Sequence, residues 1–435
     1  MKICLIDPPL PYSSPPLAPL ILEYLGGLTK RVMPEAEIEL LDPKFRPFSV
    51  EEIEADLVGI CGSRIVTLPW VYRTADALRK RGMRVVLGGF NPSAMPEEAK
   101  KHADAVVIGE AESVWPEVLE DARKGQLKPF YYGKPLPLEN LPLPIRLPGY
   151  KFHGIFTMRG CSYGCKFCAL RGLYGKAHRY RPIDEVVKEV DALKEKFFWN
   201  TDGNIWGGNI NRAIELFTAL KGSNKKWYGF GDLKALETPS GDKLIKAARE
   251  SGLLSLWLGC EEKFAGAFEK NKVEAIKKLK DNGIDPILAI ILGKRTDTPD
   301  DFDRIVELSD KLGIMVHPFL LVPFPGTELY EEYKPFLLKE GQWKFYDGAH
   351  ALFSHPQMSP EQREEKFFSI VFELFSLKRV FRHLFEIPLN VFPAGHFAFL
   401  MREFPMRQGM KAAHRKWLAE KADSVVAEKL SLEKA

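Results

Sequence analysis

The segment Arg159-Gly160-Cys161-Ser162-Tyr163-Gly164-Cys165-Lys166-Phe167-Cys168 contains three cysteines with the spacing C-x3-C-x2-C. An iron–sulfur cluster is normally held by four cysteine thiolates. Three thiolates on one loop can bind three irons of a cubane and leave the fourth iron open to a ligand that is not protein. The segment therefore predicts an iron–sulfur cluster held by Cys161, Cys165 and Cys168, and the missing fourth ligand is the main indication of function.

A disulfide or a structural zinc site would be a simpler use of three cysteines. The chain has six cysteines and starts with a strand-like segment in place of a signal peptide, which disfavours a secreted disulfide framework. Zinc sites usually pair one cysteine hook with a second hook, and no second hook follows here. A zinc site completed by His153 or His178 stays as the alternative. The remaining cysteines, Cys4, Cys61 and Cys260, are expected in core positions.

The overall composition is that of a globular protein. A chain of 435 residues is long enough for two or three domains. The net charge of +4, from 62 basic and 58 acidic side chains, gives no indication of nucleic-acid binding. The apolar runs are shorter than the roughly eighteen residues that a membrane-spanning helix needs. We expect a cytoplasmic protein with reduced thiols and no membrane span.

Residues 1–133 alternate short apolar runs with helical patterns, which is typical of a mainly parallel, doubly wound sheet. The expected strands are Lys2–Ile6, Ile38–Leu41, Leu57–Cys61, Arg84–Leu87 and Ala105–Ile108. The expected helices are Leu17–Thr29, Pro69–Lys80, Pro96–Lys100 and Ser113–Lys124. Ligands of such sheets bind at the carboxyl ends of the strands, and glycines at several of these ends let a ligand approach the backbone.

This first segment resembles the cobalamin-binding domain that precedes many radical S-adenosylmethionine (SAM) enzymes. The resemblance is carried by residues 56–60, 88–93 and 103–112. The D-x-H-x-x-G motif of other cobalamin proteins is absent, and Asn91 stands where family members often have a histidine. Arg64 is the candidate for the lower face of the cobalt, where a positive side chain would disfavour the higher oxidation states. The cobalamin contacts that the resemblance implies are Pro8, Gly62, Ser63, Arg64, Gly88, Gly89, Asn91, Gly109, Glu110 and Glu112.

A second run of strands and helices follows a linker. Residues 134–149 are rich in proline and predict a stiff connection between domains. The strands expected within residues 150–345 are Gly154–Met158, Lys196–Asn200, Trp227–Asp232, Leu254–Gly259, Pro286–Leu292 and Met315–Leu321. Six such units predict a partial TIM-type (β/α)6 barrel with its chemistry at the carboxyl ends of the strands.

This second segment resembles the core of the radical SAM enzymes. The cysteine loop has the family's C-x3-C-x-φ-C form, with Phe167 as the aromatic residue, and residues 256–261, 290–293 and 323–330 resemble later family motifs in the right order. The resemblance implies that the amino and carboxylate groups of SAM bind the open iron of a [4Fe–4S] cluster. The SAM contacts that it implies are Phe167, Asp202, Asn204, Glu261, Gly293 and Pro323. For Asp202 and Asn204 a role as a turn or helix cap stays open.

Residues 346–435 have helical periodicity and many phenylalanines, as in residues 360–384. Apolar stripes at helical spacing usually face a core. We expect an α-helical C-terminal extension that Pro388, Pro393 and Pro405 divide into short helices.

The two resemblances together imply a cobalamin-dependent radical SAM C-methyltransferase. A 5′-deoxyadenosyl radical would remove hydrogen from an unactivated carbon, and methylcobalamin would give its methyl group to that carbon; no catalytic side chain is assigned. The alternatives are a related cyclase or rearrangement enzyme without methyl transfer, a non-catalytic iron–sulfur electron carrier, and a radical enzyme whose first domain has lost cobalamin. A reductant such as flavodoxin or ferredoxin is the expected partner. The substrate stays open between a small molecule, a lipid and a peptide or protein.

Overall fold

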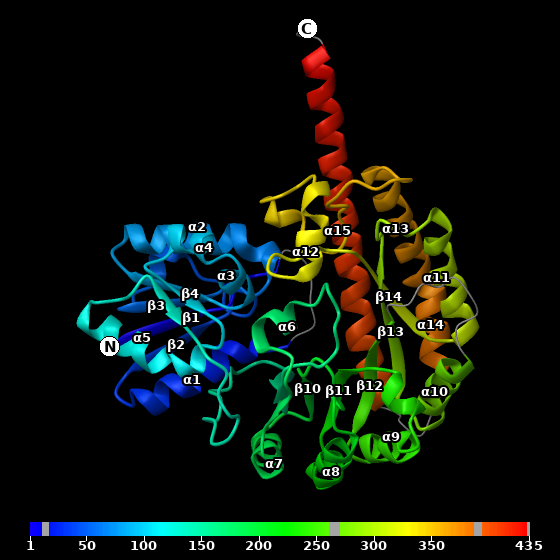
Figure 1. Cartoon of the computed structure of the whole chain (residues 1–435), viewed down its shortest axis with the longest axis horizontal. Coiled ribbons are helices and arrows are strands. Elements are labelled where there is room, and N and C mark those ends of the chain that lie inside the picture. Colours follow the sequence, from blue (N-terminus) through cyan, green and yellow to red (C-terminus); the bar gives the residue numbers. More distant parts are fainter. Residues whose placement is uncertain (11–16, 261–269, 387–393, 433–435) are drawn as a thin grey trace.

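The computed structural model describes the chain except for residues 11–16, 261–269, 387–393 and 433–435. Figure 1 shows a sheet built from the first part of the chain beside a second sheet with helices around it, and a long C-terminal helix that runs past the second sheet. Within the described residues the strands form two six-stranded sheets and one two-stranded sheet. The expected α/β fold, with two parallel sheets and a helical C-terminal region, is confirmed.

The first sheet has the strand order β2-β1-β3-β4-β5-β6, and all neighbours are parallel. Its strands are β1 Lys2–Ile6, β2 Glu37–Leu41, β3 Leu57–Cys61, β4 Arg84–Gly88, β5 Ala105–Ile108 and β6 Phe130–Tyr132. The direction in which strands are added reverses between β1 and β3, which is where ligands of doubly wound sheets bind. The sequence did not predict β6, because three residues show no periodicity.

Helices cover both faces of this sheet, which explains why its strands are continuously apolar. Ile3 and Leu5 pack on the face of α1 and α5, whereas Cys4 and Ile6 pack on the opposite face with α2. The helices of this part are α1 Leu20–Val32, α2 Leu68–Lys80, α3 Phe90–Ala94, α4 Pro96–His102 and α5 Trp115–Lys124. The helix expected from Leu17 begins at Leu20 instead, directly after Pro19.

The second sheet has the order β14-β13-β12-β11-β10-β7, again all parallel. Its strands are β7 Phe152–Ile155, β10 Phe197–Asn200, β11 Lys226–Gly231, β12 Leu253–Gly259, β13 Asp285–Leu292 and β14 Met315–Leu320. The helices between them are α7 Ile183–Ala192, α8 Ile210–Leu220, α9 Gly241–Glu250, α10 Lys270–Asp281 and α11 Pro299–Leu312. The edge strands β7 and β14 do not pair with each other, so the barrel is open.

The strand expected to run to Met158 stops at Ile155. Met158–Arg159 forms a separate short strand, β8, which pairs antiparallel with β9, Arg179–Tyr180. These two short strands enclose the cysteine loop and the short helix α6, Ala169–Tyr174. The loop therefore has both ends fixed beside each other.

The C-terminal part differs from the prediction in two places. The helical pattern of residues 360–384 is divided between α13, Pro360–Leu374, and α14, Leu377–Glu386. The prediction that Pro405 ends a helix is wrong, because it lies inside α15, Ala394–Leu432. Packing of α15 against the second sheet compensates for the hydrogen bond that proline removes. Pro388 and Pro393 lie outside the described residues.

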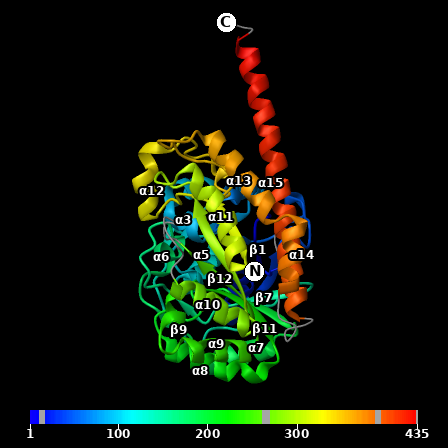
Figure 2. The same ribbon diagram turned by 90° about the vertical axis from the view of Figure 1, so that its right-hand side faces the viewer.

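Figure 2 shows α13 and α14 on the same side of the molecule as α15, whose C-terminal half projects away from the body. A further short helix, α12, spans Glu328–Tyr333. In the described part of the chain no helix is both long and apolar enough to cross a bilayer. The domain boundaries at residues 133, 149 and 345 stay predictions.

Candidate active site

The three cysteines lie on the loop between β8 and α6, and each is partly exposed. The loop requires glycine at position 160, where φ is +88° and a Cβ atom would lie 2.0 Å from the Ala177 carbonyl oxygen. Burial raises the pKa of the Cys161 thiol. A thiolate at this position therefore needs a nearby positive charge, which an iron cluster supplies.

The structure disfavours a zinc site at this loop. Among the described residues no three His, Cys, Asp or Glu side chains converge closely enough to hold one metal ion. A cubane needs less convergence, because each cysteine binds a different iron. His178 accepts a hydrogen bond from the Ser162 N–H at 3.2 Å, and His153 is buried against Glu23 at 2.8 Å. Neither histidine is placed to complete a zinc site.

A cavity of about 520 Å³ lies between the carboxyl ends of the two sheets. The first sheet contributes the ends of β1 and β3, and the second contributes the cysteine loop and the end of β10. Its lining includes Asp7, Pro8, Cys61, Ser63, Arg64, Arg159, Cys161, Tyr174, Trp199 and Asp202. The cysteine loop and the ligand-binding edge of the first sheet therefore share one space.

A second cavity of about 130 Å³ runs into the first sheet and shares Cys61, Ser63, Arg159 and Tyr174 with the first. It passes over Gly59, where a Cβ atom would lie 2.8 Å from Leu5 Cδ2. The lining also includes Val86, Gly88, Gly89, Val107, Gly109, Glu110, Glu112 and Trp115. The two cavities together suit a ligand with a broad part between the sheets and a narrow part inside the first sheet.

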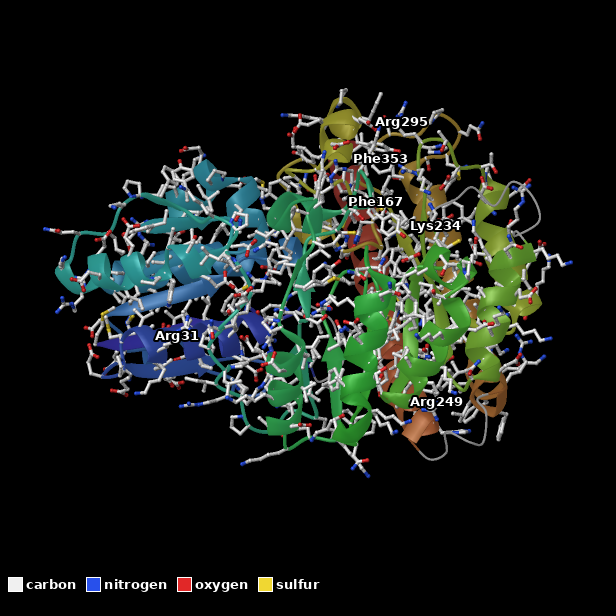
Figure 3. The ribbon with its side chains drawn as sticks, turned by 60° about the horizontal axis from the view of Figure 1, so that its bottom comes forward. Arg31, Phe167, Lys234, Arg249, Arg295 and Phe353 are labelled. Carbon is white, nitrogen blue, oxygen red and sulfur yellow. The ribbon has the colours of Figure 1, made fainter. Side chains whose placement is uncertain are left out.

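A third cavity of about 430 Å³ lies at the ends of β13 and β14. Phe167 of the cysteine loop forms one side of it, and in Figure 3 this side chain lies near the middle of the molecule. The remaining lining is mostly apolar and includes Val66, Ile291, Phe319, Leu321, Val322, Phe324 and Tyr346. Ser63 and Arg64 line both this cavity and the first one.

Comparison with known proteins agrees with this arrangement. Residues 31–119 match the family model described as B12 binding domain. The bacteriochlorophyllide d C-8(2)-methyltransferase of Chlorobaculum tepidum is 27% identical over 434 residues, which cover 91% of this chain and 96% of that protein. Over most of its length the chain is therefore similar to a methyltransferase, and its first part is similar to B12-binding domains. The bacteriochlorophyllide d C-12(1)-methyltransferase of the same organism is 27% identical over 77% of this chain and 78% of its own length.

The fold is also that of a solved structure. The radical SAM methyltransferase TsrM from Kitasatospora setae, with cobalamin and a [4Fe–4S] cluster bound, superposes with a TM-score of 0.62 at 17% identity. The superposition covers 76% of this chain and 77% of that one. At this identity the likeness shows the fold alone.

The residues predicted to contact SAM are unevenly placed. Phe167 lines the third cavity, whereas Gly293 follows β13 with φ +78° and Pro323 is buried between Val322 and Phe324. An apolar slot beside the cysteine loop suits the adenosine part of SAM. Glu261 lies outside the described residues.

Asp202 and Asn204 are occupied by the protein. The Asp202 carboxylate accepts hydrogen bonds from the Thr157 N–H at 2.7 Å and the Thr157 hydroxyl at 2.6 Å. Burial raises the pKa of Asp202, and these hydrogen bonds oppose the rise. Asn204 donates to Asp232 at 2.6 Å and accepts from the Trp206 N–H at 3.3 Å. These contacts favour the turn-and-cap role, in which Asp202 holds the corner between β7 and β8.

Gly62 and Asn91, two of the predicted cobalamin contacts, connect the ends of the strands and line none of the three cavities. The Asn91 side chain is fully buried and donates to the Gly62 carbonyl at 2.7 Å. Gly62 in turn donates its N–H to the Gly88 carbonyl at 2.7 Å. Gly89, with φ +104°, lies against the Ser63 hydroxyl, and a Cβ atom there would lie 2.4 Å from it. Asn91 therefore fixes the edge of the sheet on which Ser63 stands.

Arg64 has a defined partner at the edge of the first cavity. Its guanidinium forms an ion pair with Asp7 and donates to the Pro8 carbonyl at 2.8 Å. Burial raises the pKa of Asp7, although Arg64 opposes the rise. The residues at these cavities fit cobalamin: a glycine-lined channel enters the sheet, and no histidine lines the first cavity or this channel among the described residues.

Glu110 and Glu112 do not offer uncommitted carboxylates to a cofactor. Arg159 donates to Glu110 at 2.6 Å and also pairs with Glu112, and Arg179 pairs with Glu110. These ion pairs lie where the cysteine loop meets the first sheet. Neither arginine was predicted from the sequence as a site residue. Their positions on either side of the cysteine loop, directly before Gly160 and after His178, were the available signal.

Proposed function

We propose that the chain is a C-methyltransferase that uses a [4Fe–4S] cluster, SAM and cobalamin. One observation carries the proposal: Cys161 of the cysteine loop and the ends of β1 and β3 line the same cavity of about 520 Å³. A carbon held there is within reach of two reagents bound to opposite sheets, and such placement lowers the entropic cost of reaction. The names of both bacteriochlorophyllide d relatives specify methylation at a numbered carbon.

The chemistry these groups supply when bound is the removal of hydrogen from an unactivated carbon and the delivery of a methyl group to it. Cys161, Cys165 and Cys168 would hold the cluster, Phe167 would lie beside the adenosine part of SAM, and the cavity over Gly59 would hold the cobalamin tail. The protein's own contribution is placement. Arg159 ties the cysteine loop to the first sheet through Glu110, and Asp202 holds the corner that precedes the loop.

The proposal includes an environment and a partner. The cysteines of the loop must be reduced to bind iron, which suits a reducing cytoplasm. A reductant such as flavodoxin or ferredoxin would deliver the electron that SAM cleavage needs.

The test uses the full chain, purified and reconstituted anaerobically with iron, sulfide and hydroxocobalamin. Incubation with SAM and dithionite should yield 5′-deoxyadenosine, the protein should retain one cobalamin, and Cys161→Ala should form no deoxyadenosine. A product heavier by one CH2 unit supports methyl transfer, whereas a product that has only lost hydrogens supports the cyclase. Absence of deoxyadenosine from the reconstituted wild type would support the electron carrier and overturn the proposal. Failure to retain cobalamin would favour a radical enzyme that has lost this cofactor.

A further inference from the structure

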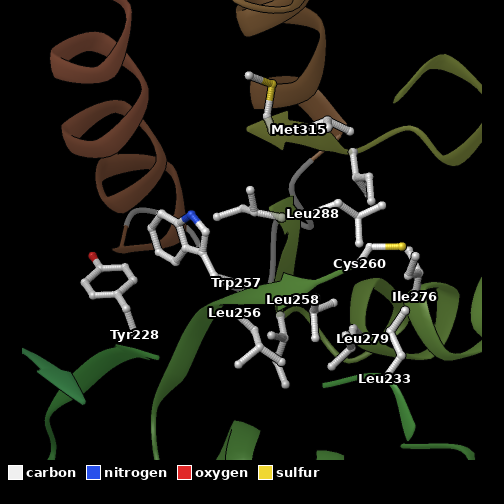
Figure 4. Close-up of a cluster of buried hydrophobic side chains, with 14 of the residues drawn as sticks. Tyr228, Leu233, Leu256, Trp257, Leu258, Cys260, Ile276, Leu279, Leu288 and Met315 are labelled. Atoms are coloured by element: carbon white, nitrogen blue, oxygen red, sulfur yellow. The ribbon is translucent and has the colours of Figure 1, made fainter. Parts of the chain in front are cut away.

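The concave face of the second sheet carries a group of aromatic side chains on three neighbouring strands. Trp199 on β10, Phe230 on β11 and Trp257 on β12 form the group, which we name the aromatic wall. Ring centroids are 4.8 Å apart for Trp199 and Trp257, 5.6 Å for Trp199 and Phe230, and 6.0 Å for Phe230 and Trp257. In Figure 4 the side chain of Trp257 points to the opposite side of β12 from Leu256 and Leu258, which pack toward the outer helices.

The wall is partly open to solvent although it lies on central strands. Phe230 is 38% exposed, and Trp199 is half-buried and lines the cavity of about 520 Å³ together with Cys161. Large aromatic side chains on central strands are normally buried. Of the three rings Trp199 lines the cavity, and the exposed ring of Phe230 lies beside it.

The lower end of the wall is closed by α15. The Arg402 guanidinium lies 5.3 Å from the centre of the Trp257 ring, and only 8% of Trp257 is exposed. Arg402 also donates to the Ser255 hydroxyl at 2.6 Å. Trp257 is therefore covered by α15, and the rings of the wall that stay accessible are Trp199 and Phe230.

The charged side chains that line the cavity already have partners within the protein. Asp7 pairs with Arg64, Arg159 pairs with Glu110, and Asp202 accepts from Thr157. Replacing such a partner by a ligand would leave a buried charge unpaired, which is costly. Among the described lining residues the cavity thus offers a ligand mainly apolar and aromatic surface.

We propose that the aromatic wall binds the substrate, and that the substrate presents a flat, apolar ring system to it. This rests on the proposed function, because the carbon to be methylated must lie between the cysteine loop and the first sheet. Trp199 of the wall lines that space from the side of the barrel. Aromatic rings bind flat ring systems by offset or edge-on contact in addition to the area buried. Among the described lining residues, a peptide or a charged small molecule would meet charged groups that are already paired within the protein.

The test measures binding of two probes to the wild-type protein reconstituted with cluster and hydroxocobalamin, by anaerobic equilibrium dialysis. Pheophorbide a is the flat ring probe, and squalene is an apolar probe without rings. Pheophorbide a should bind, and Phe230→Ala and Trp199→Ala should each weaken it about tenfold or more. Phe230→Leu and Trp199→Phe are matched variants. Phe230→Leu keeps apolar area without a ring and should restore little of the binding that Phe230→Ala loses. Trp199→Phe keeps a ring and should restore most of the binding that Trp199→Ala loses.

The control is Phe385→Ala on α14, because Phe385 is 82% exposed and lies outside the cavity. Its Kd for pheophorbide a should equal that of the wild type. Equal binding by the wild type, Phe230→Ala and Trp199→Ala would overturn the inference, as would squalene binding as tightly as pheophorbide a. If Trp199→Ala loses its cofactors, the Kd values of Phe230→Leu and of the wild type for pheophorbide a are compared instead, and equal values overturn the inference. Wild-type protein that forms deoxyadenosine but binds no pheophorbide a refutes this inference alone; wild-type protein that forms no deoxyadenosine refutes the proposed function.

Discussion

Two buried arginines hold the second sheet on either side of the aromatic wall. Arg159 pairs with Glu110 at the cavity and joins the cysteine loop to the first sheet. Arg402 pairs with its neighbour Glu403 and joins α15 to the barrel through Asp285 at 2.8 Å and Ser255 at 2.6 Å. Both are guanidinium–carboxylate pairs with little solvent exposure. Their chemistry is alike and their positions differ, so the comparison separates side chains that place reagents from side chains that only hold the fold together.

Arg159→Ala tests the cavity side and should have the largest effect. Removing the guanidinium takes this ion-pair partner from the buried Glu112 and leaves Glu110 with Arg179, which should cost about 3–5 kcal/mol of stability. It also releases the end of the cysteine loop, and misplacement of about 1 Å can reduce turnover roughly a hundredfold. Deoxyadenosine formed per bound cluster is the measurement. Unchanged turnover per cluster with full cobalamin content would show that Arg159 has no part in placing the loop.

Arg402→Ala is the matched change below the wall. It leaves Glu403, which is fully buried, beside His317 at 3.3 Å, and should lower the free energy of unfolding by about 3–5 kcal/mol. Deoxyadenosine formed per folded, cluster-containing molecule should stay at the wild-type value. Urea-induced unfolding, followed by circular dichroism, measures the free energy of unfolding. A fall in turnover per cluster as large as that of Arg159→Ala would remove the distinction between the two arginines.

The lower network should also respond to acid. Burial raises the pKa of Glu403, but the charges of Arg402 and His317 outweigh burial and lower it from 4.5 to about 2. The folded state therefore favours the carboxylate, whose contribution is present above pH 4.5 and is lost as the pH falls toward 2. That contribution is about 3 kcal/mol.

The measurement is the difference in unfolding free energy between the wild type and Glu403→Gln, taken at falling pH. The difference should shrink below pH 4.5, because the wild type then loses the carboxylate that the variant never had. A difference that does not change with pH would mean that folding does not lower the pKa of Glu403.

The smallest effect is expected from the rings that lie over these arginines. Phe156 lies 4.8 Å from the Arg159 guanidinium, and Phe399 lies 5.1 Å from that of Arg402. Phe156→Leu and Phe399→Leu should each cost about 1–2 kcal/mol, since both remove a desolvated cation–π contact. Thermal unfolding measures the cost, and only Phe156→Leu should also reduce deoxyadenosine formation. Equal turnover in both variants would indicate that Arg159 keeps its position without the ring.

Much of the fold could be predicted because its signals are local. The apolar runs of β1, β3, β4 and β5 and the helices between them follow from short-range periodicity, and so does the parallel order of the second sheet. The short strands β8 and β9 could not be predicted. Each has two residues, and they pair across the whole cysteine loop.

The cysteine ligands of the site could be predicted from the sequence, but the hydrogen bonds among its other residues could not. The spacing of the three cysteines is a local property, and the structure places Cys161 in the shared cavity. The roles of Asp202 and Asn91 depend on partners that sequence order conceals. Asp202 accepts from Thr157, 45 residues earlier, and Asn91 donates to Gly62, 29 residues earlier.

The sequence by itself determined the alternation of strands and helices, the two parallel sheets and the cysteine loop, because each depends on residues close together in the chain. Only the tertiary structure decided which charged side chains line the cavity and which partners within the protein they bind. Arg159 meets Glu110 across 49 residues, and Arg402 meets Ser255 across 147. Pairing a buried charge lowers its desolvation cost only when the partner is brought close in space, and that depends on the packing of the whole chain.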